Sequence, residues 1–481
     1  MRFETPTREE ILSGPPIRTM ARIGAPAVVS TFLFTLYNLV DAFWVGRLPS
    51  EESAAVFAGI QVSWPIVWFL IAFVSGFGGA AASALISQYT GAKRPLEANV
   101  ALNQLVSLST IAAVVLGLAG YALSPWLLAL LVGQGSVADA ASLYIGIVFL
   151  GLPTMVLPGL FTSAFSAVGD TVTPLLVNGA GVLLNMLLDP PFVLGWGPIP
   201  RMGIAGAAYA TVISQGLATI LFFLLLLRRR GVLHLQARAL RLRWAWVVKG
   251  LRIGVPAALA QSSMAFGFVI MTKVISRLPN PEVTLAGYGV GDRVLGMAFI
   301  FTDGLGTGLT TMVGQALGAD RMERARELLR KGLWALVGIL SVEAVILWAV
   351  RYPAIALFIP GRPDVADVGG RLIASFAASL PFLGTFFTAL SIYRASGHNV
   401  PAMVLGFLRL WCLRIPLALL LGFVLKLGAD GVWWGMSASN FVAGLIALGF
   451  LANRSLQSRV VEPLPEEGEA LAVAPKTADV G

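Results

Sequence analysis

Arg22-Ile-Gly-Ala-Pro-Ala27 returns later in the chain as Arg252-Ile-Gly-Val-Pro-Ala257. Further matches follow at nearly the same offset, about 225 to 230 residues, as expected for a duplicated unit that has drifted by small insertions. The matched sets are Arg47-Leu48-Pro49 with Arg277-Leu278-Pro279, Gln88, Gly91, Ala92, Arg94 and Ala98 with Gln315, Gly318, Ala319, Arg321 and Ala325, and Ala167, Gly169 and Pro174 with Ala395, Gly397 and Pro401. The chain therefore consists of two copies of one architecture.

The composition indicates a protein embedded in a membrane. Of 481 residues, 57% are hydrophobic and 12% are charged, whereas about a quarter of a soluble protein is charged. A helix needs roughly 20 apolar residues to cross the hydrocarbon core. Runs of at least that length without Asp, Glu, Lys or Arg occupy 100–132, 140–168, 205–227, 372–393 and 431–452.

Apolar runs between polar breaks predict an all-α integral membrane protein with twelve transmembrane helices. The predicted helices lie near 22–46, 56–89, 98–123, 138–166, 173–196 and 203–227, and near 250–276, 284–316, 325–350, 366–393, 400–425 and 430–452. Because six is even, the second repeat begins on the same side as the first, so the repeats are parallel, related by an axis along the membrane normal. The expected parts are an N-terminal segment (1–21), two six-helix units (22–227 and 250–452), a basic linker (228–249) and a disordered tail (453–481).

Lys and Arg concentrate in the N-terminal segment, in the linker and in the loops on the same side. The positive-inside rule then places both termini in the cytoplasm of a multi-pass protein of the plasma membrane. The net charge of +9 is a topology and lipid-headgroup signal, and we expect no nucleic-acid partner. Residues 1–22 lack the apolar core of a cleavable signal peptide. With Cys412 as the single cysteine and His234 and His398 as the only histidines, we expect no metal centre and no cofactor.

Two carboxylates fall well inside predicted helices of the first half, away from their ends: Asp41 and Asp189. An ionised carboxylate at membrane depth costs on the order of 2.5 to 3.5 kcal/mol, so such a residue is a functional candidate by default. Polar residues share their helix faces or lie on neighbouring helices, namely Tyr37, Asn38, Tyr144, Asn178, Asn185 and Thr211. These amides and hydroxyls could equally well only join helices to one another.

Comparison of the two repeats indicates that the fold itself does not require these carboxylates, because a residue that the fold requires should occur in both repeats. When the two repeats are aligned, Asp41 corresponds to Met271 and Asp189 corresponds to Pro416. These two carboxylates therefore occur in the first half alone. Burial disfavours the ionised form of a carboxylate, which is what a proton carrier requires. Pro26 interrupts the first helix before Asp41 and is either a hinge coupled to protonation or a passive kink.

The second half carries its own charges at or near membrane depth: Lys273, Asp292, Arg293, Asp303, Glu343, Arg409 and Arg414. Mutual ion pairs or side chains reaching the interface are the simplest interpretation, and their role stays open. Glycine-rich stretches at 287–291 and 304–308 follow no strand and lack a phosphate-binding lysine. This chain therefore has no ATP site of the P-loop type.

Several motifs together resemble the multidrug and toxic compound extrusion (MATE) family over roughly residues 15 to 455. They are Val168-Gly-Asp-Thr-Val-Thr-Pro174, Leu184-Asn-Met-Leu-Leu-Asp-Pro190, Gly203-Ile-Ala-Gly-Ala-Ala-Tyr-Ala-Thr211, and Gly314-Gln-Ala-Leu-Gly-Ala319 with Glu323 and Ala325. The resemblance implies a V-shaped pair of six-helix lobes, alternating access, and export of amphipathic, often cationic compounds in exchange for protons or sodium.

The pattern is closest to the archaeal and DNA-damage-inducible-F-like branch, whose cation site lies in the N-lobe. The resemblance implies that Asp41, Asn185 and Asp189 couple the ion, that Tyr37, Asn38, Tyr144, Asn178 and Thr211 support ion or substrate, and that Pro26 is the bending proline. The sodium-coupled bacterial branch relies on acidic residues in its seventh and tenth helices, and 254–276 and 372–393 contain none. Arg394-Ala-Ser-Gly-His398 also lacks the acid of its first-half counterpart.

The leading hypothesis is a monomeric, proton-coupled antiporter that exports drug-like molecules and is not an enzyme. Sodium could use the same oxygens at Asp41, Asn185 and Asp189, so the coupling ion stays open. A flippase for lipids or lipid-linked precursors is the alternative, because Arg293, Arg409 and Arg414 suit an anionic headgroup. A membrane-embedded enzyme is disfavoured, since no nucleophile and base stand at hydrogen-bonding spacing.

Overall fold

The computed structural model describes residues 5–45, 50–131, 136–196, 198–228, 232–359 and 361–453, so the predicted tail lies almost wholly outside the described residues. Every regular element described is helical. The elements are α1 (Arg8–Ser13), α2 (Pro16–Val45), α3 (Ser50–Gly91), α4 (Pro95–Leu131), α5 (Ser136–Leu150), α6 (Leu152–Ala167), α7 (Val172–Pro190) with a π-helical turn (Pro191–Gly195), α8 (Ile204–Leu227), a 3-10 turn (Ala237–Leu240), α9 (Trp244–Ile275), α10 (Pro281–Gly318), α11 (Met322–Phe358), α12 (Pro363–Ser396), α13 (Asn399–Phe407), a π-helical segment (Leu408–Arg414), α14 (Ile415–Leu419), a π-helical turn (Leu420–Val424) and α15 (Gly428–Asn453).

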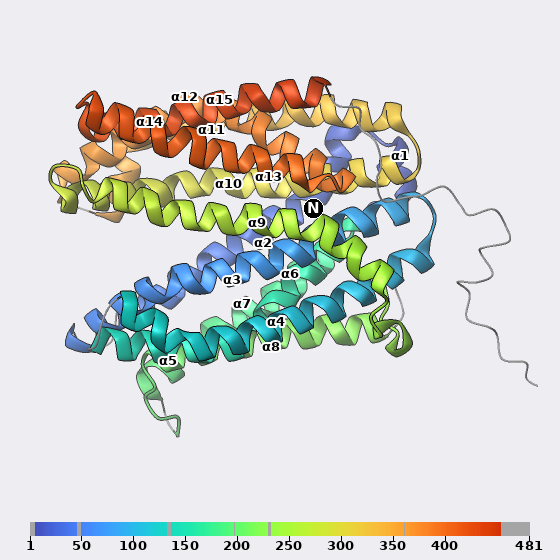
Figure 1. Cartoon of the computed structure of the whole chain (residues 1–481), viewed down its shortest axis with the longest axis horizontal. Helices are drawn as coiled ribbons and strands as arrows, with labels where there is room; N and C mark the ends of the chain where they lie inside the picture. The colour runs from blue at the N-terminus through green and yellow to red at the C-terminus, as the bar shows by residue number, and fades with distance from the viewer. Residues whose placement is uncertain are drawn as a thin grey trace, which may run out of the picture.

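The helices form two lobes, which confirms the predicted pair of six-helix repeats. Helices α2 to α8 make the N-lobe and α9 to α15 make the C-lobe (Figure 1). Between the lobes, α3 packs against α9 and α10, and α2 packs against α10. Figure 1 shows the ribbons of the two lobes close together at the end that carries α1 and farther apart at the opposite end.

Among the described residues, ten helices are long and apolar enough to cross a membrane, and the pair α5 and α6 adds an eleventh span if counted as one. Helix α10 completes the predicted twelve. It has 38 residues, enough to cross, but it carries Asp292, Arg293 and Asp303 along its length. The sequence predicted it, near 284–316, from its apolar run between polar breaks.

One predicted helix, 138–166, is in fact broken. Helices α5 and α6 meet at an angle of 54°. Pro153 supplies no backbone N–H to the helix before it, and at Gly151 a Cβ would lie 2.5 Å from a Val212 methyl group. Because Gly151 has no side chain, the backbone at the bend can pack directly against Val212 of α8. The apolar pattern of the sequence does not reveal this local effect.

Matching contacts tie the first helix of each repeat to the loop after its fourth span. The Thr171 hydroxyl donates to the Ile23 carbonyl at 2.8 Å, and the Asn399 amide donates to the Ile253 carbonyl at 2.7 Å. The two acceptors are equivalent positions of the duplicated motif that opens each unit. The duplication seen in the sequence is therefore also a duplication of hydrogen bonds.

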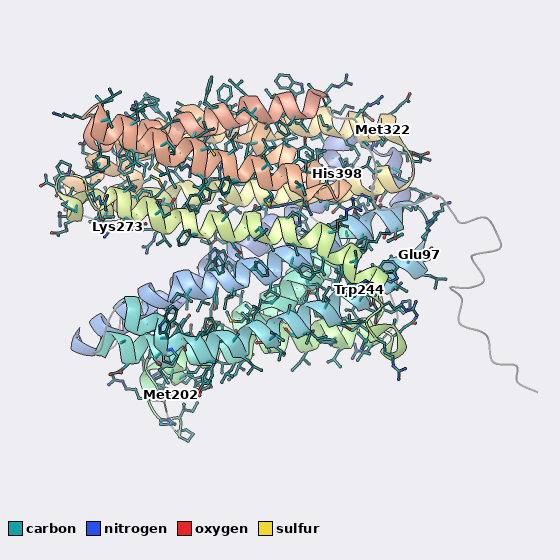
Figure 2. The ribbon with its side chains drawn as sticks, viewed as in Figure 1. Glu97, Met202, Trp244, Lys273, Met322 and His398 are labelled. Carbon is teal, nitrogen blue, oxygen red and sulfur yellow. The ribbon has the colours of Figure 1, made fainter. Side chains whose placement is uncertain are left out.

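Segments 1–21 and 228–249 hold more helix than the sequence predicts. Helix α2 begins at Pro16 and α9 at Trp244. Figure 2 shows Trp244, Glu97, Met322 and His398 at the α1 end of the molecule, and Lys273 and Met202 at the opposite end. The loops that the sequence assigns to one side of the membrane thus lie at one end.

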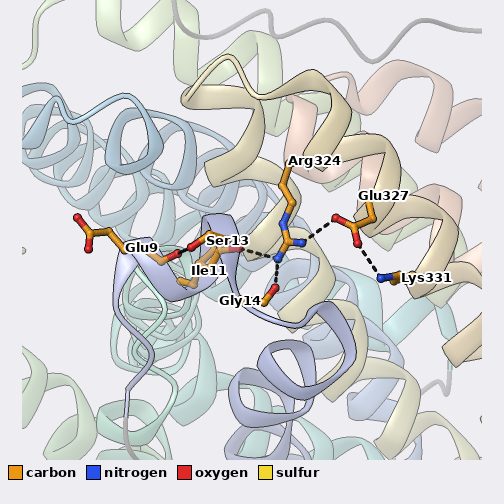
Figure 3. A network of polar contacts seen from close by, with 7 residues as sticks. All are labelled: Glu9, Ile11, Ser13, Gly14, Arg324, Glu327 and Lys331. Carbon is orange, nitrogen blue, oxygen red and sulfur yellow. Dashed lines mark hydrogen bonds and ion pairs between the residues drawn. The ribbon is translucent and has the colours of Figure 1, made fainter.

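Helix α1 bridges the lobes at this end. Arg8 Nε donates to the carbonyl of Gly91 in the N-lobe at 3.1 Å. Arg324 of α11 donates to the carbonyls of Ile11, at 3.3 Å, and Gly14, and pairs with Glu327 (Figure 3). Ile11 and Leu12 are buried in the core shared with α10.

A capping box fixes α1 itself. The Glu10 backbone N–H donates to the Thr7 hydroxyl, and the Thr7 backbone N–H donates to the Glu10 carboxylate at 2.9 Å. That backbone hydrogen bond, followed by the bond from the Arg22 guanidinium, holds the pKa of Glu10 below its ordinary value. Glu10 is therefore ionised at neutral pH and holds α1 against the start of α2.

Candidate functional site

Asp189, near the end of α7, is a buried carboxylate of the N-lobe. Both Asp189 and Asn185 are 0% exposed. They stand one turn apart, and Asn185 Nδ2 lies 3.5 Å from Asp189 Oδ1, at the outer limit of a hydrogen bond. The pair presents amide and carboxylate groups together on one face of α7.

Helix α7 ends where it does because Pro190 and Pro191 are consecutive. Neither ring nitrogen carries a hydrogen, so the carbonyls of Met186 and Leu187 lose the donors they would have in an α-helix. The chain continues as the π-helical turn Pro191–Gly195. The structure thus places backbone oxygens without their usual α-helical donors within one turn of Asp189, an arrangement that suits a cation.

Tyr37 and Thr211 connect two helices of this lobe. The Tyr37 and Thr211 hydroxyls lie 3.0 Å apart in a buried hydrogen bond between α2 and α8. Tyr37 is 6% exposed and Thr211 is 4% exposed. The structure brings these two predicted residues together.

The other two described candidates have different surroundings. Tyr144 of α5 is buried in the apolar cluster that contains Val67 and Ile145. Asn178 Nδ2 donates to the Thr162 hydroxyl at 3.0 Å and so joins α7 to α6 about two turns before Asn185. The side chains of Asn38 and Asp41 lie outside those that the structure describes.

Pro26 lies next to the boundary between the lobes. Two residues earlier, a Cβ at Gly24 would lie 2.9 Å from the Gly304 carbonyl oxygen of α10. The equivalent Pro256 follows Gly254, which packs as closely on Phe77 of α3. A bend at either proline would therefore move a point where the lobes touch.

The sequence left open whether the charges at membrane depth in the C-lobe form mutual ion pairs or reach the interface. Asp292 interacts electrostatically with Arg414 and Arg293, and Asp303 with Arg394. None of these pairs is among the ion pairs within 4.0 Å that the described residues form. The Asn440 side chain accepts from both Arg409, at 3.2 Å, and Arg414, at 2.7 Å.

Sequence reasoning did not identify Asn440, because its partners lie 26 and 31 residues earlier. The available signal was a pair of arginines five residues apart in an apolar run, facing a polar Ser439-Asn440 on the last helix. Among the residues that the structure describes, neither buried carboxylate oxygen of Glu343 in α11 has a hydrogen-bond partner.

On α7, Asp189 and Asn185 offer carboxylate and amide oxygens, which are ligands of the kind that suit sodium. The carboxylate can also accept a proton. Within the described part of the chain, no three His, Cys, Asp or Glu side chains gather as a metal-binding set.

Comparisons with known proteins agree with this architecture. The chain is 27% identical over 439 residues to a probable multidrug resistance protein of Bacillus subtilis, covering 90% of this chain and 93% of the relative. It is 26% identical over 451 residues to an FAD transporter of Shewanella oneidensis, covering 93% and 96%. A Pyrococcus furiosus transporter of the MOP superfamily, described as having a binding pocket of reverse polarity, superposes with a TM-score of 0.85 at 21% identity, over 93% of this chain and 97% of that one.

The model of the MatE family matches twice, over residues 26–190 and 256–420. The two matches coincide with the two repeats and together cover more than half of the chain. The chain therefore belongs to the MatE family of multi-pass membrane transporters.

Proposed function

We propose that this protein is a secondary active antiporter that exports amphipathic, often cationic compounds in exchange for protons. The observation that carries the proposal is the buried Asp189, 0% exposed beside Asn185, in a lobe whose duplicate has Pro416 at that position. The names of relatives support the substrate class, since several are multidrug resistance or multidrug export proteins.

In this proposal the carboxylates of Asp41 and Asp189 carry the coupling ion. A proton neutralises a carboxylate and removes the cost of holding its charge away from water. Asn185, Tyr37 and Thr211 orient the site, and a bend at Pro26 changes how the lobes meet at Gly24. Sodium at the same oxygens is the alternative coupling ion.

The proposed orientation follows from the basic loops. We place both termini and the α1 end in the cytoplasm, and the protein in the plasma membrane as a monomer. The lobes would then be closed toward the cytoplasm and apart toward the outside. Release of a cationic compound to the outside would accompany proton entry.

The test is transport in proteoliposomes with a pH gradient and a sodium gradient imposed separately. Asp189→Asn keeps the shape of the side chain but cannot exchange a proton, so dye exchange driven by the pH gradient should fall at least tenfold. Asp139→Asn, an exposed position at the start of α5, is the matched control and should retain exchange. Full exchange by the Asp189 variant would remove the residue from the coupling mechanism.

The second candidate is a lipid or lipid-linked precursor flippase, favoured by the buried Arg409 and Arg414 of the C-lobe. Competition separates the two functions. A polyprenyl phosphate that displaces a transported cationic dye favours the flippase, and displacement by other cationic dyes alone favours the exporter.

A further inference from the structure

Two arginines lie inside the C-lobe with almost no access to solvent. Arg409 is 4% exposed and Arg414 is 5% exposed. Both belong to the π-helical segment Leu408–Arg414. Burying two like charges in one lobe is unfavourable unless something compensates for them.

The π-helical segment explains why the two side chains converge. In an α-helix, residues five apart point about 140° away from each other. The i→i+5 bonding of a π-helix instead places such residues over one another, and such segments are frequent at functional sites. Accordingly, both guanidinium groups reach the same acceptor, Asn440 Oδ1.

The hydrogen-bond partners of the pair are neutral. Arg414 Nε also donates to the Ser439 hydroxyl at 3.2 Å, and Asn440 in turn donates to Ser379. Each guanidinium offers five donors, of which Arg409 uses one and Arg414 two among the described residues. Arg409 also lies over the Phe386 ring, 4.6 Å from its centroid, a contact that stabilises a cation without neutralising it.

Further donors lie nearby. The Arg409 Nε, Tyr288 hydroxyl and Trp433 Nε1 are buried without a hydrogen-bond partner in the part of the chain that the structure describes. Tyr288 stacks on Trp433 with ring centroids 5.9 Å apart and interacts electrostatically with Arg414. Trp433 also lines a groove of about 650 Å³ between α11, α12 and α15.

Among the described residues, one carboxylate acts on the pair, that of Asp292. It interacts with Arg414 and also with Arg293. Arg409 has another positive charge, Arg414, as its electrostatic neighbour. The interior thus has an excess of both positive charge and hydrogen-bond donors.

We propose that this part of the C-lobe binds an anionic oxygen group, a phosphate or carboxylate, between the π-helical segment, α10 and α15. Guanidinium pairs are well suited to such groups. The group belongs either to a soluble amphipathic molecule or to a lipid headgroup that enters from the groove at Trp433. The inference goes beyond proton-coupled export and does not depend on which ion drives it.

The site is confined to one repeat. At the offset that matches Asp189 with Pro416, Arg409 and Arg414 fall on Val182 and Leu187. One lobe therefore holds buried acid and the other buried base on equivalent helices. A molecule with a cationic and an anionic group could contact both.

Binding to purified protein in neutral-lipid nanodiscs tests the proposal, with riboflavin 5′-phosphate and riboflavin as a matched pair of fluorescent probes. The phosphorylated probe should bind at least tenfold more tightly, and inorganic phosphate should reduce that difference. Arg409→Gln and Arg414→Gln should abolish the difference. Arg351→Gln, outside this cluster, should keep it. Equal affinity of the wild-type protein for the two probes would overturn the proposal for soluble ligands.

The variant Asn440→Asp distinguishes loss of the binding site from loss of the folded structure. It supplies a built-in carboxylate to both guanidinium groups, so the thermal midpoint should rise while the preference for the phosphorylated probe disappears. A preference that survives Asn440→Asp in a folded protein contradicts the site. Because this assay imposes no ion gradient, its failure is distinct from a failure of Asp189 to couple protons.

A lipid source is tested in nanodiscs containing phosphatidylglycerol. If a headgroup occupies the site, this lipid should raise the thermal midpoint of the wild-type protein relative to phosphatidylcholine and compete with the phosphorylated probe. The Asn440→Asp variant should show neither effect. If the wild-type protein shows no preference for the phosphorylated probe and no effect of the lipid, anion binding at this site is refuted.

Discussion

Gln88 and Gln315, equivalent residues of the two repeats, reach across the lobe boundary in opposite directions. Gln88 Nε2 donates to the Ala395 carbonyl at 2.7 Å, and Gln315 Nε2 donates to the Ala167 carbonyl at 3.0 Å. The acceptors are themselves equivalent. Both glutamines are 0% exposed, so these bonds close the α1 end of the molecule symmetrically.

Removing both glutamine side chains should loosen this end. Gln88→Ala with Gln315→Ala leaves two buried carbonyls without these donors, at about 1 to 3 kcal/mol each. Ser87→Cys, placed in a Cys412→Ser background, reports the opening because Ser87 is 0% exposed. Its reaction with a membrane-impermeant maleimide should accelerate at least tenfold, and an unchanged rate would show that the glutamines do not hold the end closed.

A methyl group at Gly318 should prevent closure. A Cβ there would overlap the backbone oxygen of Gln88, and neither backbone can move aside cheaply. Gly318→Ala should therefore lower the thermal midpoint and export together. Gly338→Ala, where a Cβ meets nothing within 4 Å, is the control and should be stabilised by up to about 1 kcal/mol through helix propensity.

Docking of α1 should weaken in acid. Because the folded-state pKa of Glu10 is lowered by the Thr7 backbone N–H and by Arg22, its contribution is complete above the ordinary glutamate pKa. The contribution is lost as pH falls through the lowered value. Hydrogen exchange of amides 8–13, corrected for intrinsic rates, should quicken from pH 6 toward pH 3 in the wild type. In Glu10→Gln it should be fast throughout.

The Tyr37–Thr211 bond should appear in a double-mutant cycle. Tyr37→Phe and Thr211→Val each remove one buried hydroxyl, and the interaction free energy should be about 1 kcal/mol. The free energy of unfolding of the four proteins in detergent measures it. Strict additivity would indicate that the two hydroxyls do not interact.

The fold could be predicted from the sequence because the internal repeat and the apolar runs both indicate how many helices there are and roughly where each lies. The sequence showed Gln88 and Gln315, and likewise Ala167 and Ala395, as matched positions. It did not show that Gln88 bonds to Ala395, since the two lie 307 residues apart. Asn185 and Asp189 were predicted to share a face, and the structure places them 3.5 Å apart.

What the sequence could not predict depends on departures from regular α-helix. The bend at Gly151 and the convergence of Arg409 with Arg414 both need a change in helical geometry. Neither change alters the apolar pattern, because a broken or π-helical span is as hydrophobic as a straight one. The contact of Arg409 and Arg414 with Asn440 was not predicted for this reason, since the register that brings each arginine to Asn440 was unknown.

The contacts that close the α1 end of the molecule should depend little on ionic strength. At its centre the contacts run from amides to backbone carbonyls and between glycines and backbone, and a carbonyl released there can bond to water at little net loss, about 0.5 to 1.5 kcal/mol per bond. Such a seal is nearly indifferent to ionic strength. Breaking these central contacts should therefore depend little on the salt of the compartment that they face.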